Sequence, residues 1–65
     1  MNEKVQKFID YFKNQDVERR VLIRDSFLEK TGLRYPAWYA KIRRKVFSPL
    51  ELAALSEITG EEFTN

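Results

Sequence analysis

The chain has 65 residues, a formal net charge of +2, and neither cysteine nor histidine. This length allows one domain, and the missing residue types exclude disulfides, thiolate zinc sites and thiol or imidazole catalysis. Hydrophobic residues at 43% exclude a disordered chain, and the longest apolar run, Leu52–Leu55, is far too short for a membrane span. Because the charged N-terminus is no signal peptide, we expect one cytoplasmic domain over residues 1–65.

The first predicted helix covers residues 2–14, with Asn2 as its N-cap. Its apolar residues recur at intervals of three and four, which is the spacing of one helical face. These residues are Val5, Phe8, Ile9 and Phe12.

The second predicted helix covers residues 16–31, with Asp16 as its N-cap. We expect Gly32 to end it, because glycine adopts a left-handed backbone at little cost. Leu22 is expected to face water. The expected core side is formed by Val17, Val21 and Leu28, with Ile23 and Phe27 on its flank.

The third predicted helix covers residues 36–45. Pro36 suits its first position, because no amide donor is needed there. Trp38 and Ile42 are the expected buried residues, and Tyr39 and Val46 are further candidates.

The fourth predicted helix covers residues 49–59. Ser48 and Glu51 form a capping-box pattern, and Phe47 and Leu52 have the spacing of a hydrophobic staple. Gly60 should end this helix, and Phe63 should fold back onto the core. Since no segment alternates with period two, we predict an all-α, four-helix single domain.

Charge is distributed unevenly along the chain. Residues 1–29 balance six acids against six bases, and residues 51–65 carry four acids and no base. Between them, the segment 30–50 has no acidic residue at all. A positive block confined to one helix and its flanks is typical of a surface that binds a polyanion, and nucleic acid is the polyanion we expect. Its six cations are Lys30, Arg34, Lys41, Arg43, Arg44 and Lys45.

Two helices joined by a glycine-containing turn, the second of them basic, describe a helix-turn-helix. The small Ala37 and Ala40 would let the third helix approach the major groove of double-stranded DNA closely. We expect base-edge contacts from outward-reaching side chains and phosphate contacts from the cations nearer the helix ends. The first group is Arg34, Tyr35, Lys41 and Arg44, and the second is Lys30, Arg43 and Lys45.

The order of these elements resembles the phage-repressor type of helix-turn-helix over roughly residues 17–60. The resemblance lies in a turn glycine, a recognition helix, a polar gap and a further helix that ends in Ile58-Thr59-Gly60. It implies a DNA-binding protein, a transcriptional regulator in its biological role, that reads DNA with the third helix. The segments that carry it are Phe27–Leu33, Trp38–Arg44, Ser48–Leu52 and Ile58–Gly60.

Other interpretations stay open at this stage. The same basic face of a helical interaction module would bind an acidic protein, and Tyr35 and Tyr39 would stack on unpaired bases in a single-strand binder. Leu22 and the outward side of Tyr11, if exposed, would mark a homodimer contact. No catalytic pairing is found, so we do not expect an enzyme, a cofactor, a small-molecule ligand or a metal. The carboxylates Glu57, Glu61 and Glu62 are interpreted as plain surface.

Overall fold

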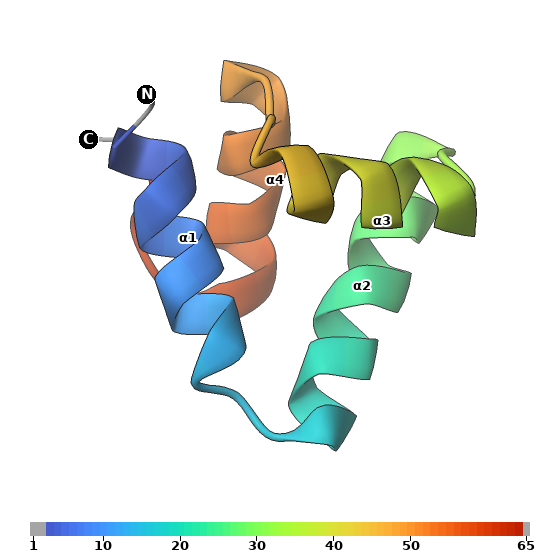
Figure 1. Cartoon of the computed structure of the whole chain (residues 1–65), viewed down its shortest axis with the longest axis horizontal. Coiled ribbons are helices and arrows are strands. Elements are labelled where there is room, and N and C mark those ends of the chain that lie inside the picture. The colour runs from blue at the N-terminus through green and yellow to red at the C-terminus, as the bar shows by residue number, and fades with distance from the viewer. Residues whose placement is uncertain (1–2, 65) are drawn as a thin grey trace.

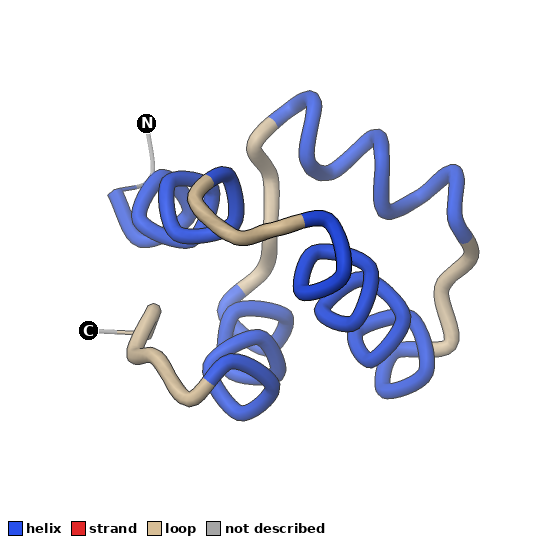
Figure 2. Tube along the Cα trace, turned by 90° about the horizontal axis from the view of Figure 1, so that it is seen from below, coloured by secondary structure: helices blue, strands red, loops and turns tan. Residues whose placement is uncertain are grey.

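The computed structural model describes residues 3–64 and contains four helices within them. The helices are α1 (Glu3–Lys13), α2 (Val17–Thr31), α3 (Tyr35–Arg44) and α4 (Pro49–Thr59). No strand occurs between residues 3 and 64, which confirms the all-α prediction for that part of the chain. α2 packs most extensively against α4, and α3 lies along one edge of the molecule with no helix on its outer side (Figures 1 and 2).

Local capping interactions define most helix ends as predicted. The Asp16 side chain accepts a hydrogen bond from the Arg19 amide, 2.8 Å away, at the start of α2. Gly32 and Gly60 end α2 and α4 in the left-handed conformation, with φ near 75°. The capping box of Ser48 and Glu51 at the start of α4 is also confirmed. The expected Asn2 cap lies outside the described residues.

The third helix is displaced by one residue from the predicted range 36–45. Its first intrahelical hydrogen bond runs from the Trp38 amide to the Arg34 carbonyl, so Arg34 is the N-cap and Pro36 occupies the second position. At the other end, Lys45 takes a left-handed conformation with φ of 57° and donates its amide to the Ile42 carbonyl. This turn ends the helix at Arg44, one residue earlier than expected.

Aromatic rings from every part of the chain meet in the core. The Phe8 ring of α1 lies 6.3 Å from that of Trp38 in α3, 5.5 Å from Phe47 and 5.3 Å from Phe63, measured between centroids. The prediction that Phe63 folds back is confirmed, since its side chain is fully buried. Ring pairs in edge-on geometry add stability beyond the area they bury. The buried hydrophobic residues between positions 3 and 64 are Val5, Phe8, Ile9, Ile23, Phe27, Trp38, Phe47, Leu52, Leu55 and Phe63.

The predicted core side of α2 is wrong. Ile23 and Phe27 are fully buried, whereas Val17 and Val21 are exposed and Leu28 is only partly buried. Ile23 and Phe27 are one turn apart, so they present one narrow stripe that faces the core. The neighbouring stripe, which contains Val17 and Val21, lies outside the core. The choice between two adjacent apolar stripes depends on which helices pack there, and the spacing of one helix does not contain that information.

Four further expectations have mixed outcomes. Leu22 is 52% exposed, as predicted. Tyr11 is half-buried, because its ring packs 5.7 Å from that of Phe63, so it offers little outward surface. Tyr39 and Val46, considered as core candidates, are both exposed.

Candidate nucleic-acid interface

The inward side of α3 is set by Trp38, which is buried against the rings of Phe8 and Phe27. At 3.6 residues per turn, the positions two and five residues away point to the opposite side of the helix. Those positions hold Pro36, Ala40 and Arg43. Pro36 and Arg43 are exposed, and Ala40 is partly exposed. Between its two ends, the outward surface of α3 therefore carries no bulky side chain. We call this part of the helix, around Ala40, its low surface.

Two of the six cations form ion pairs with glutamates of α4. Lys30 Nζ lies 3.0 Å from Glu57 Oε2 on the surface. Lys41 Nζ lies 2.9 Å from Glu51 Oε2, and both of these side chains are mostly buried. Lys41 also lies over the Phe47 ring, 6.0 Å from its centroid. Lys41 thus joins α3 to α4, a role that differs from the expected contact with base edges.

The other four cations make no ion pair with any residue between 3 and 64, and all four are exposed. Arg34 immediately precedes α3, whereas Arg43, Arg44 and Lys45 lie at its far end. At a rise of 1.5 Å per residue, Arg34 and Arg43 are about 14 Å apart along the helix axis. The four cations of the segment 30–50 that have no ion pair are therefore divided between the two ends of α3.

The alanines predicted to allow close approach do lie together. Ala37 and Ala40 line a shallow surface depression, with Lys41, Arg44 and Val46 around it. Arg44 is the exposed cation nearest to this low surface, because it is one turn away from Ala40 on the same side of α3. The structure brings Ala37 and Arg44 together here.

Arg24 of α2 holds both tyrosines of α3. Its guanidinium donates to the Tyr39 hydroxyl at 2.9 Å and lies over the Tyr35 ring, 4.7 Å from the centroid. It also pairs with Asp25 at 3.0 Å. The hydrogen bond to Asp25, followed by the bond to Tyr39, raises the pKa of Arg24 above its ordinary value. Tyr35 and Tyr39 remain about half exposed, so each still presents one side to solvent.

Sequence reasoning missed Arg24 because residues 1–29 are balanced in charge and contain no cationic block. The only available signal was its position one turn after Arg20, which places two arginines on one side of α2. The partner tyrosines are ten or more residues further on, beyond the turn. Such a contact depends on the crossing of α2 and α3.

Among residues 3–64, no group of three or more carboxylate side chains is arranged to hold a metal ion. No helix between residues 3 and 64 is long and apolar enough to cross a membrane. The chain matches no protein-family model, no curated protein and no solved structure.

Proposed function

We propose that this chain is a small DNA-binding protein, a transcriptional regulator in its biological role, that places α3 in the major groove. The observation that carries the proposal is the charge arrangement on α3. Four exposed cations without ion-pair partners flank a low surface of small residues, on a helix whose outer side is open. Cations of this kind neutralise phosphates, whereas small side chains allow the backbone to approach base edges.

The dimensions support the same proposal. The major groove is about 12 Å wide, and the two groups of free cations are about 14 Å apart along α3. Arg34 precedes one end of α3, and Arg43 and Lys45 lie at the other, so cations available for phosphates are present at both ends of the helix. Arg44, beside the alanines, is the side chain best placed to donate to guanine. Lys41 is left out of this set because Glu51 holds it.

Salt dependence of binding tests the proposal. Each phosphate contact contributes a slope of about −0.9 to the dependence of log K on log salt. We therefore expect Arg43→Ala and Lys45→Ala each to weaken binding to every duplex and to reduce that slope by about one. Lys13→Ala, which removes an exposed cation of α1, is the matched control and should leave the slope unchanged.

Arg44→Ala should behave differently, because a base contact carries sequence preference. We expect it to reduce the preference for a selected site over random duplex, with the site obtained from a randomised duplex pool. No binding to duplex DNA by micromolar protein at low salt would overturn the proposal and would favour an acidic protein as the ligand of these cations. Preference for unpaired oligonucleotides would instead favour single-strand binding through Tyr35 and Tyr39.

A further inference from the structure

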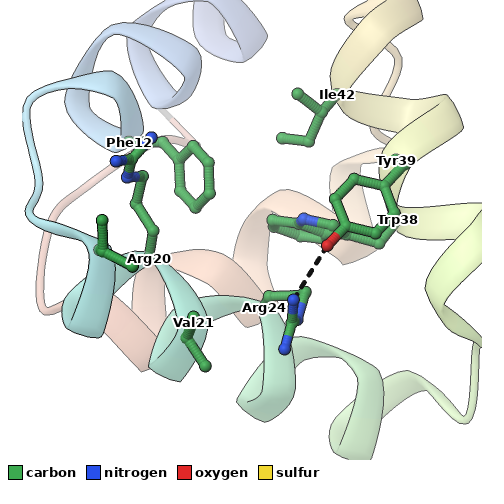
Figure 3. A pocket seen from close by; sticks show the side chains of 8 residues that line it. Phe12, Arg20, Val21, Arg24, Trp38, Tyr39 and Ile42 are labelled. Carbon is green, nitrogen blue, oxygen red and sulfur yellow. Dashed lines mark hydrogen bonds between the residues drawn. The ribbon is translucent and has the colours of Figure 1, made fainter.

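A second surface of the molecule, beside α3, has the composition of a docking site. A groove with a volume of about 280 Å³ lies between the end of α1, α2 and α3. Figure 3 shows Phe12 and Arg20 on one side of it and Tyr39 and Ile42 on the other, with Trp38 behind. Six of the eight lining residues are apolar or aromatic, the other two are Arg20 and Arg24, and no carboxylate lines it.

The groove contains apolar surface that the fold itself leaves uncovered. Val17 is 65% exposed and Val21 is 38% exposed, although both are aliphatic residues on a helix that packs against the core. Scattered exposed apolar residues need no explanation, but these two share one groove with Tyr39, which is half exposed. Contiguous apolar surface with a polar rim is typical of interaction sites.

Arg20 provides a second and independent observation. Its side chain makes no hydrogen bond or ion pair with any residue from 3 to 64, and its Nε atom is buried without a partner. A guanidinium donor that is removed from water and left unpaired is costly. The other arginine, Arg24, already bonds Asp25 and Tyr39. Arg20 is therefore the lining residue that lacks an acidic partner.

We propose that this groove binds an acidic amphipathic helix of another protein. One or two large apolar side chains of that helix would fill the space above Trp38 and Val21, and a carboxylate one turn away would pair with Arg20. The volume of the groove lies just below the roughly 300–1,000 Å³ that is typical of pockets for drug-sized ligands. A groove of this size has room for one or two side chains of a bound helix. A second copy of this chain is a poorer occupant, because a symmetric contact would bring Arg20 and Arg24 of both copies together.

The groove is compatible with simultaneous use of the outward surface of α3. Tyr39 and Ile42 line the groove, and Arg43 lies one turn beyond Tyr39, whereas Ala40 and Arg44 line the depression on another side of α3. A bound helix would thus leave Arg44, the proposed base-contacting residue, free. The docking proposal does not depend on DNA binding, since it rests on the groove and on Arg20 alone.

Selection from a displayed library tests this proposal. The library consists of helix-forming peptides of about 15 residues, with one face randomised, and the target is the full chain. We expect the enriched peptides to share apolar residues at helical spacing with aspartate or glutamate one turn away. Arg20→Gln and Val17→Ser should each weaken their binding by about fivefold or more, because they remove the charge partner and part of the apolar surface.

Leu22→Ser is the matched control. Leu22 is also an exposed aliphatic residue of α2, but it lies outside the groove, so this variant should bind the enriched peptides within about twofold of the wild type. Failure to enrich any peptide, or enriched peptides that lack acidic residues or bind the Arg20→Gln variant equally well, would overturn the proposal. Self-association that Val17→Ser abolishes and Leu22→Ser preserves, seen by sedimentation equilibrium, would instead assign the groove to a second copy.

Discussion

Lys45 combines positive charge with an unfavourable backbone conformation. It is the one non-glycine residue between positions 3 and 64 with a positive φ, 57°. A side chain in this region costs roughly 1–2 kcal/mol, and helices commonly place glycine there, as α2 and α4 do. Strained residues are often kept where their side chain has a function. The presence of lysine at this position is what we would expect if its charge contacts phosphate.

Lys45→Gly should therefore separate stability from binding. We expect the free energy of unfolding to rise by about 0.5–1 kcal/mol, because glycine relieves the backbone strain. DNA affinity should fall, since one phosphate contact is lost. Lys45→Ala is the matched control: it removes the same charge and keeps the strain. Urea unfolding followed by Trp38 fluorescence and anisotropy of a labelled duplex measure the two properties. If only the glycine variant loses affinity, the backbone turn and not the charge is what DNA binding requires.

At the scale of the elements, α3 and α4 are joined through one carboxylate. Glu51 accepts from the Ser48 amide at 2.8 Å, which closes the capping box, and pairs with Lys41 at 2.9 Å. Burial has the largest effect on the pKa of Glu51 and raises it, but the bonds from Ser48 and Lys41 together outweigh burial. The pKa of Glu51 thus lies below its ordinary value.

This lowered pKa predicts an acid-sensitive contribution to stability. Because the folded chain holds the ionised form, the stabilisation is complete above the unfolded pKa of glutamate and is lost as pH falls through the lower folded pKa. We expect Glu51→Gln to reduce the free energy of unfolding by about 1 kcal/mol near pH 7 and by much less near pH 3. Urea titrations at both values measure this difference.

The comparison with wild type at each pH is the control for other carboxylates. The pKa of Glu62 is also lowered, chiefly by its hydrogen bonds from Thr64, but that effect is common to both proteins and cancels. A deficit of the Glu51→Gln variant that is the same at both pH values would mean that ionisation of Glu51 does not stabilise the fold.

The helix ends are predicted well from the sequence, because the interactions that fix them are local. The caps at Asp16, Gly32, Ser48 and Gly60 each involve residues within one turn of the helix end, so nearby sequence contains the whole interaction. Contacts between helices were missed for the opposite reason. The burial of Ile23 in place of Val21 depends on how α2 crosses its neighbours.

The same distinction applies to the candidate site. A run of cations is visible in the sequence, but which of them remain free depends on the placement of α4. Glu51 and Glu57 come from the acidic final segment, and they occupy Lys41 and Lys30. Charge counted along the chain therefore overestimates the positive charge that is available to a ligand.

The whole molecule depends on one aromatic cluster, and Phe8 is its shared member. Its ring contacts those of Phe12, Trp38, Phe47 and Phe63, so α1, α3, the segment before α4 and the C-terminal segment all meet at this side chain. A domain of this size has a total stability of only ~3–10 kcal/mol. The position of α3, and hence of its cations, is therefore maintained by a residue far from the proposed DNA surface.

Phe8→Ala should consequently abolish the fold at ordinary temperature or leave it barely stable. Removing a buried phenylalanine costs about 3–5 kcal/mol, which is a large part of the ~3–10 kcal/mol expected for the domain. Circular dichroism against temperature should show loss of helix well below the wild-type midpoint, with DNA binding lost in parallel. Leu50→Ala also removes a large apolar side chain, but one that is 84% exposed, so its midpoint should stay within a few degrees of wild type. If Phe8→Ala melts like Leu50→Ala, the helices hold together without the cluster, and α1 is not needed to position α3.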